Sequence, residues 1–332
     1  MANALALDDA GSVYVAGATS GSIDGSTTAR MQDLFLMKLD SNGSTTTWTK
    51  QLGSLLNDQA ADIAVKGAYV YVVGTAGGTI GTGTSQGGND LFIAWHYAST
   101  GEQVRIKMLG SSLNDEGHGV TADTNGNVYV VGMTPGSVGG SNAGKNDILL
   151  AKYDKNGLNS FPGSGWTKQF GSAENDTGYS VAVSHDGSHL YVTGEAGAAI
   201  DGKSGSGMRD VVLASYATAD GTKEWVEVIG SSDDDVGIDV VAGENGDVFV
   251  LGWTDGGFDG HAYIGGRDVF LLQYSSTGTK LNSWQLGTDS DETGFDIVLG
   301  PAGIVYLVGR TNGIVAGGNA GGDDVFVLKL QP

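Results

Sequence analysis

The sequence of 332 residues contains no cysteine and only four prolines. The lack of cysteine excludes disulfides, thiolate catalysis and zinc sites with cysteine ligands. Basic residues are also few: 17 lysines and arginines stand against 38 aspartates and glutamates, which gives a formal net charge of −21. This balance argues against nucleic acid as a partner, because phosphate binding needs basic patches. No apolar run approaches the length that spans a bilayer, so no transmembrane segment is predicted.

The first residues, "MANALALDDAGS", lack the basic region and the long apolar region of a signal peptide. A strongly acidic surface is nevertheless shared by many extracellular proteins. We therefore expect an extracellular or cell-surface protein whose targeting segment has been removed or lies outside this sequence.

The sequence is rich in glycine, with 57 residues, and glycines mark an internal repeat. An apolar stretch that ends in glycine recurs about every 58 residues, at Gly17, Gly74, Gly132, Gly194, Gly252 and Gly309. We predict a single domain over residues 1–332. Its six repeats are placed at 4–62, 63–119, 120–180, 181–239, 240–296 and 297–332.

Each repeat is predicted to form four short antiparallel strands. Stretches such as "VYVVG" and "DLFIAWHY" are apolar at consecutive positions, so both faces of each small sheet must be covered. Radially repeated four-stranded units that cover one another form a β-propeller. We therefore predict an all-β, six-bladed β-propeller, with a stacked β-solenoid as the alternative. Four tryptophans at one place in the repeat are expected to pack between blades: Trp48, Trp166, Trp225 and Trp284.

The sixth repeat ends at "VFVLKLQP" and contains no fourth strand. The last blade is therefore expected to lack its outer strand. Residues Val325–Leu330 would then form an open edge through which the chain could self-associate.

The repeat pattern "VYVVG…NDxFLxKYDxxG…W…LGS…ND" resembles the SBBP family of bacterial β-propeller repeats. The resemblance extends over residues 4–330. It implies secreted or surface proteins of bacteria and archaea, usually with no assigned activity. The family takes its name from a seven-bladed propeller, whereas this chain has six repeats.

A short acidic segment, such as "GSSLNDEGHG" at residues 110–119, occurs five times. One interpretation is calcium binding, because Ca²⁺ takes several oxygen ligands from a flexible loop. The other is that Asn and Asp side chains cap backbone N–H groups between blades. The sequence leaves both open. The candidate metal ligands are Asn57, Asp58, Asp62, Asp234, Asp235, Asp239, Asp289, Asp291, Glu292 and Asp296.

The fifth repeat has an unusual loop, "GWTDGGFDGHAYIGGRD", at residues 252–268. Aromatic faces stack on sugar rings or on partner side chains, and neighbouring acids accept hydrogen bonds from hydroxyls. The candidate ligand-binding residues are Trp253, Asp255, Phe258, Asp259, His261, Tyr263 and Arg267. The alternative is a loop with its own apolar cluster, since Phe258 aligns with an apolar residue in the other repeats.

No catalytic motif stands out. His185 and His189 are four residues apart, but they flank a turn, so their spacing is not helical. The matches to G-x-S-x-G (residues 83–87) and to the P-loop pattern G-x-x-x-x-G-K-S (residues 197–204) lie in Gly-rich loops with no helix predicted after them. We predict a non-enzymatic binding module that engages a protein or a cell-surface glycan through its loop face, with calcium as the only expected cofactor. The alternatives are an assembly module that pairs through the open edge of the sixth blade, and a calcium-dependent propeller hydrolase or lyase.

Overall fold

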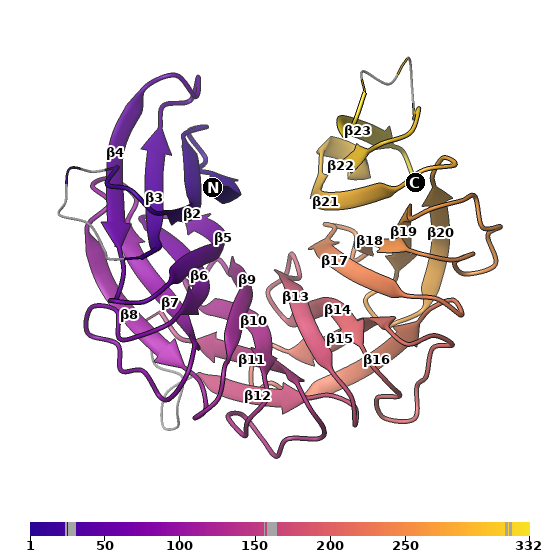
Figure 1. Cartoon of the computed structure of the whole chain (residues 1–332), viewed down its shortest axis with the longest axis horizontal. Coiled ribbons are helices and arrows are strands. Elements are labelled where there is room, and N and C mark those ends of the chain that lie inside the picture. The colour runs from indigo at the N-terminus through magenta and orange to yellow at the C-terminus, as the bar shows by residue number, and fades with distance from the viewer. Residues whose placement is uncertain (24, 26–30, 156, 158–164, 316–317, 319–320) are drawn as a thin grey trace. The chain divides into compact units, whose positions relative to one another are not determined.

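The computed structural model describes the chain except for residues 24, 26–30, 156, 158–164, 316–317 and 319–320. Its strands form six separate antiparallel sheets, the blades of the predicted six-bladed β-propeller (Figure 1). Among the described residues, the only helix is the single 3-10 turn Pro301–Gly303. The chain divides into two compact units, each described here by itself. Unit 1 comprises residues 1–142 and 146–170, and unit 2 comprises residues 143–145 and 171–332.

Unit 1 holds three four-stranded blades, in which strands A to D follow chain order. Blade 1 contains β1 (Ala2–Leu7), β2 (Val13–Thr19), β3 (Asp33–Leu39) and β4 (Thr46–Leu52). Blade 2 contains β5 (Asp58–Lys66), β6 (Tyr69–Ala76), β7 (Asp90–Tyr97) and β8 (Gln103–Leu109). Blade 3 contains β9 (Glu116–Ala122), β10 (Val128–Thr134), β11 (Asp147–Tyr153) and β12 (Trp166–Phe170).

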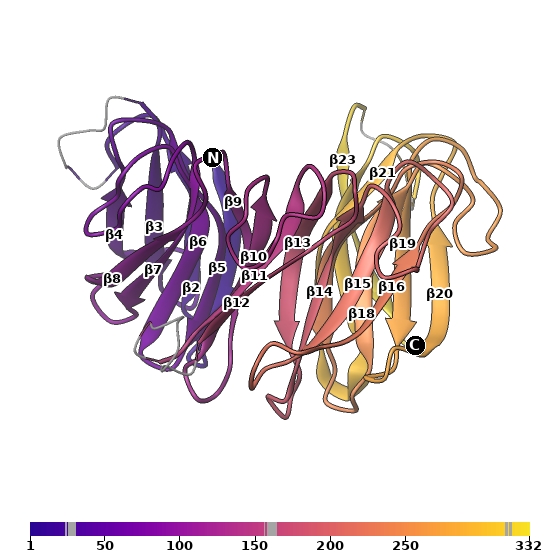
Figure 2. The same cartoon turned by 90° about the horizontal axis from the view of Figure 1, so that it is seen from below.

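Unit 2 holds two four-stranded blades and, as predicted, a last blade of three strands. Blade 4 contains β13 (Asp176–Val183), β14 (His189–Ala196), β15 (Asp210–Ala217) and β16 (Lys223–Ile229). Blade 5 contains β17 (Asp235–Ala242), β18 (Val248–Thr254), β19 (Asp268–Tyr274) and β20 (Lys280–Leu286). Blade 6 contains β21 (Glu292–Leu299), β22 (Val305–Thr311) and β23 (Asp324–Leu330). Figure 2 shows the same strands after a turn of 90°.

The sequence-based repeat boundaries fall inside the first strand of each following blade. The boundary at 62/63, for example, lies within β5, and the one at 239/240 lies within β17. The reason is that the acidic residues, whose pattern predicts loops, already belong to strand A. Strand A therefore begins about five residues earlier than its apolar core suggests.

The glycine that marks the repeat is required by a bulge in strand A. In blade 4, the pairing of β13 with β14 shifts register between Gly178 and Ser180, directly opposite Gly194. A Cβ atom on Gly194 would lie only 1.9 Å from the backbone oxygen of Thr177. The same close approach occurs at Gly74, where the oxygen of Gln59 would lie 2.0 Å away. Only glycine allows this contact, which explains why the residue recurs.

The core lies between consecutive blades. We call the face of a blade that packs on the next blade in sequence its leading face, and the opposite one its trailing face. Between blades 4 and 5, Val211 and Leu213 of the leading face share a buried cluster with Val240 and Phe270 of the trailing face. Corresponding positions form buried clusters between blades 1 and 2, 2 and 3, and 5 and 6. Both faces of blades 2 and 5 are thus covered, as the consecutive apolar residues predicted.

The strand D tryptophans close these junctions at one end. The Trp225 indole N–H donates to the carbonyl oxygen of Ser276 in the next blade, over 3.0 Å. In unit 1, Trp48 donates in the same way to Ala98, over 3.3 Å. The expectation that these tryptophans pack between blades is confirmed at both positions.

Candidate functional sites

The acidic residue at the start of strand A holds the turn that precedes it. The Asp58 carboxylate accepts hydrogen bonds from the backbone N–H of Ser54 over 2.5 Å and of Gly77 over 3.1 Å. The same turn is held in unit 2, where Asp176, Asp235 and Glu292 accept the N–H of Ser172, Ser231 and Thr288. These four carboxylates are almost completely buried. Their contacts fit the capping interpretation.

Two further aspartates connect neighbouring blades. Asp62 in blade 2 accepts the N–H of Val120 in blade 3 over 2.8 Å. In unit 2, Asp239 accepts the N–H of Ile297 in blade 6 over 3.0 Å and the hydroxyl of Ser180 in blade 4 over 2.6 Å. Burial raises the pKa of Asp239, and the neighbouring charge of Asp296 raises it further. These aspartates therefore tie the first strands of adjacent blades together.

The remaining candidate metal ligands lie near the loop that precedes strand C. Asn57 accepts the N–H of Gln32 over 3.3 Å, and Asp291 accepts the N–H of Arg267 over 3.0 Å. Asp234 accepts a hydrogen bond from the Arg209 guanidinium over 2.6 Å, and Asp289 is exposed. Within the described part of the chain, no three His, Cys, Asp or Glu side chains are grouped so that they could hold a metal ion.

Calcium binding by these residues stays a prediction, and a thermal melt tests it. A single site at 100 times its dissociation constant would stabilise the protein by about 2.7 kcal/mol. The melting temperature in millimolar calcium would then exceed that in EDTA, and Asp235→Asn would remove the difference. Equal melting temperatures, with Asp235→Asn destabilising in both buffers alike, would leave these side chains with their capping role alone.

Buried carboxyl groups face each other across the glycine that ends strand D. A Cβ atom on Gly230 would lie 1.8 Å from Oδ1 of Asp210 and 2.9 Å from Oδ2 of Asp235. The same arrangement surrounds Gly110, between Asp90 and Asp115. Burial, together with the negative charge of Asp210, raises the pKa of Asp235 to about 6. Each such site thus holds two buried acidic side chains.

Stability is therefore expected to fall as the pH rises through 6. Since the pKa of Asp235 is raised from 3.8 to about 6 on folding, its stabilising contribution is present in full below pH 4 and is lost above pH 6. The loss amounts to on the order of 3 kcal/mol. Urea denaturation at pH 5 and pH 8 measures the part of this loss that falls between the two pH values, about 1.4 kcal/mol. Asp235→Asn should flatten the dependence, whereas Asp9→Asn, an exposed control, should not; equal slopes for both variants would contradict this assignment.

In the loop of residues 252–268, the indole ring of Trp253, a predicted ligand-binding residue, is already covered by other side chains. The side chain of Trp253 is only 7% exposed. The guanidinium carbons of Arg267 and Arg209 lie 3.5 and 5.4 Å from its ring centroid. Arg267 in turn is held by the carboxylate of Asp255, with bonds of 2.9 and 3.2 Å. This stack of two cations on one indole orders the loop.

Phe258 is fully buried and stacks on Phe270, with ring centroids 4.2 Å apart. It thus belongs to the loop's own apolar cluster, the alternative that its alignment with apolar residues suggested. Ligand binding by Trp253 and Phe258 stays a prediction, and both side chains have little exposed surface. Both serve the packing of blade 5.

The outer part of this loop stays accessible. Tyr263 is 58% exposed and Ile264 is 41% exposed. Nε2 of His261 lies 3.2 Å from the carbonyl oxygen of Ser283, and Asp259 forms an ion pair with Lys280. Of the predicted ligand-binding residues, Tyr263 is thus the aromatic one with a free surface.

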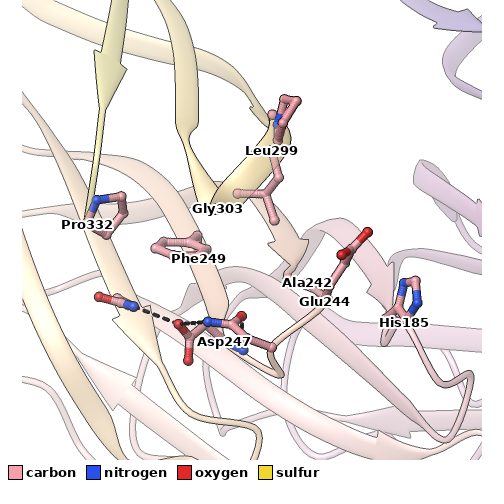
Figure 3. A pocket seen from close by; sticks show the side chains of 13 residues that line it. His185, Ala242, Glu244, Asp247, Phe249, Leu299, Gly303 and Pro332 are labelled. Carbon is pink, nitrogen blue, oxygen red and sulfur yellow. Dashed lines mark hydrogen bonds between the residues drawn. The ribbon is translucent and has the colours of Figure 1, made fainter.

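A pocket at the opposite end of blade 5 was not predicted. It has a volume of about 600 Å³ and lies among the A–B turns of unit 2 (Figure 3). Phe249 and Leu299 provide apolar surface, Asp247 lies beside Phe249, and Glu244 and His185 lie along one side. The sequence does carry a signal for it. At this place in the repeat, the other five blades have tyrosine, and blade 5 alone has phenylalanine.

Within unit 2, the leading face of blade 6 is covered by no other described blade. Val325 is 78% exposed, and Val327 is 67% exposed. At the same places on strand C of blade 5, Val269 and Leu271 are completely buried. Val298 on β21 is also half exposed. Blade 6 therefore presents to solvent the apolar residues that form the core in every junction within the two units.

Comparison with known proteins identifies the repeat. Two stretches, residues 105–138 and 165–199, match the family model of the SBBP beta-propeller repeat. Each stretch runs from a strand D through strands A and B of the following blade. No curated protein matches this chain. No helix in the described part of the chain has the length and apolar character needed to cross a membrane.

Solved structures with similar folds have diverse functions. The Pan2 WD40 domain of Neurospora crassa is 9% identical, with a TM-score of 0.54 over 98% of this chain and 78% of that one. Hydrazine synthase of Kuenenia stuttgartiensis is 14% identical, with a TM-score of 0.50 over 88% and 80%. Quinohemoprotein alcohol dehydrogenase of Comamonas testosteroni is 12% identical, with a TM-score of 0.50 over 93% and 52%. At such identities the likeness concerns the fold alone. The SBBP beta-propeller repeat model thus matches two stretches of this chain, which lie in blades 2 to 4.

Proposed function

We propose that this chain is a non-enzymatic assembly module that associates with a second copy of itself. The contact is the leading face of blade 6 on the trailing face of blade 1 of the next copy. The observation that carries the proposal is the exposure of Val325 and Val327, whose counterparts are buried wherever a following blade covers them. Exposed apolar patches of this kind mark sites of protein interaction.

The partner that covers the leading face of blade 6 is inferred from the contacts between neighbouring blades within each unit. In each of the four junctions inside the units, the counterpart of Val327 shares a buried cluster with a strand A residue of the following blade. In unit 2 these pairs are Leu213 with Val240, and Leu271 with Ile297. By its pairing with Val15, Leu5 is the blade 1 counterpart of these strand A residues. Leu5 is 64% exposed. The chain therefore carries both surfaces that form a contact between blades: the leading face of blade 6 and the trailing face of blade 1.

The open edge of blade 6 offers a second contact surface for the same partner, a second copy of the chain. Among the described strands, β23 pairs with β22 alone, so its other edge can accept a further strand. An association of leading face with trailing face is heterologous, so it generates rings or filaments. An extracellular or cell-surface location, which the acidic composition and the family resemblance suggest, would suit such an assembly.

Crosslinking between two single-cysteine variants tests the proposal. The natural chain has no cysteine, so each variant carries one thiol. Leu5→Cys and Val327→Cys are mixed and treated with a short bis-maleimide. We expect a crosslinked dimer in the mixture that neither variant forms alone. Crosslinking that is no greater in the mixture than with Gly21→Cys in place of Val327→Cys would overturn the proposal.

A second candidate function is binding of a protein or a surface glycan through the 252–268 loop, favoured by the exposure of Tyr263 and Ile264. An exposed tyrosine offers a ring face for a sugar and a hydroxyl for hydrogen bonding. Tyr263→Ala should abolish retention on a glycan array or a cell surface without changing the melting temperature. Unchanged retention would dismiss this function and leave the assembly proposal untouched.

A further inference from the structure

One register position in the middle of each blade combines an aromatic ring with a side chain from strand C. The ring, on strand B, comes from Tyr14, Tyr71, Tyr129, Tyr191, Phe249 and Tyr306 in blades 1 to 6. The residue paired with it on strand C is Lys38, Trp95, Lys152, Ser215, Gln273 and Lys329. Three of the six blades thus place a lysine beside the ring.

In these three blades, the lysine ammonium lies over the ring. Nζ of Lys38 lies 4.8 Å from the ring centroid of Tyr14. The corresponding distances are 5.7 Å for Lys152 in blade 3 and 5.8 Å for Lys329 in blade 6. A cation at this range is attracted by the negative face of the ring. The repeat therefore has a recurring ammonium position.

Blade 1 adds a carboxylate to this position. Asp8, at the start of its A–B turn, lies 3.4 Å from Nζ of Lys38 and accepts the hydroxyl of Tyr14 over 3.0 Å. In blade 3, Asp123 takes the corresponding place and accepts the hydroxyl of Tyr129 over 3.0 Å. In blade 1, the ring of Tyr14, the carboxylate of Asp8 and the ammonium of Lys38 thus contact one another.

Blade 5 keeps the ring and a carboxylate but has no lysine. Gln273 stands at the lysine's place, and Gly243 replaces the turn aspartate. The carboxylate is supplied by Asp247, which accepts hydrogen bonds from the side-chain amides of Asn245 over 2.6 Å and Gln273 over 2.9 Å (Figure 3). Both donors are neutral, so the negative charge of Asp247 is not balanced by them.

The smaller side chains of blade 5 open the pocket above this position. Its volume of about 600 Å³ lies within the range of small-molecule sites. Thirteen residues line the pocket, among them Glu244 and Asp247, and none is lysine or arginine. Leu299 and Pro301 offer apolar surface for a short hydrocarbon chain. The lining thus combines negative charge, an aromatic ring and apolar walls.

We propose that this pocket binds a primary alkylammonium group, which takes the place that lysine occupies in blades 1, 3 and 6. The ammonium lies by the ring of Phe249 and the carboxylate of Asp247, and the alkyl chain lies against Leu299. A free alkylamine and a lysine side chain of a partner protein share this chemistry. The site is separate from the blade 6 face on which the proposed assembly depends.

Ligand-observed NMR on the Val325→Lys variant tests the proposal without interference from association. The probes are butylamine, 1-butanol and Nα-acetyl-lysine methylamide. We expect butylamine to bind at least 10-fold more tightly than 1-butanol. Tighter binding of the lysine derivative than of butylamine would point to a partner protein's side chain, and the reverse to a free amine.

Gln273→Lys provides the decisive variant, because it restores the lysine of the other blades. We expect it to weaken butylamine binding at least 10-fold, and Asp247→Asn to do the same, whereas Asp9→Asn in the A–B turn of blade 1 should have no effect. Equal binding of butylamine and 1-butanol, full binding to Gln273→Lys, or no binding of any amine would overturn the proposal.

Discussion

Gly194→Ala is expected to destabilise unit 2 by about 3 kcal/mol or more. The new Cβ atom would lie 1.9 Å from the carbonyl oxygen of Thr177 and 3.0 Å from the Cα atom of Gly178. Both atoms belong to the backbone of the bulged strand β13, so no side-chain rotation relieves the clash. Strand β13 would have to move away from its pairing with β14.

Urea denaturation followed by tryptophan fluorescence measures this effect. Gly21→Ala is the matched control, because a Cβ atom there has no other atom within 4 Å and the residue is exposed. The control should unfold at nearly the same urea concentration as the natural protein. If Gly194→Ala did so too, the bulge would not be the reason for the repeated glycine.

The second large effect is a contrast between two valines at the same place on strand C. Val269→Lys would put an ammonium into the buried junction between blades 5 and 6, where the valine has no exposed surface. An unpaired buried charge costs several kcal/mol, so we expect this variant not to fold cooperatively. Val325→Lys places the same ammonium on a position that is 78% exposed, and its stability should change by less than about 0.5 kcal/mol.

Thermal unfolding at low protein concentration compares the two variants. Low concentration matters because association would add stability to the natural chain alone. Comparable losses in both variants would mean that Val325 is buried in the isolated chain. The leading face of blade 6 would then not be available to a partner.

The blades were predictable because their signals are local and repeated. The consecutive apolar residues of strands B and C and the missing fourth strand of blade 6 appear in the structure as expected, whereas strand B continues two residues beyond its glycine. Strand A was placed too late, since its first residues are acidic and match no strand pattern. Their carboxylates are buried by contacts with the preceding blade, which the sequence of one repeat does not reveal.

The candidate site was harder to predict, because exposure depends on neighbours outside the motif. The sequence indicated an aromatic loop, but the cover that Arg209 and Arg267 provide for Trp253 arises only when blades 4 and 5 meet. The pocket at Phe249 was not predicted because its signal is divided between two strands. Its signal is the replacement of tyrosine and lysine by Phe249 and Gln273, which becomes visible only when strands B and C are paired in register.

Sedimentation velocity over a range of protein concentrations tests the central claim, self-association through blade 6, most directly. The chain has a mass of 33.9 kDa. The natural protein should sediment as larger species as its concentration rises, while a Val325→Lys/Val327→Lys double variant should remain at the mass of one chain. A natural protein that stays at one chain mass at every concentration, or a double variant that associates equally well, would contradict the claim.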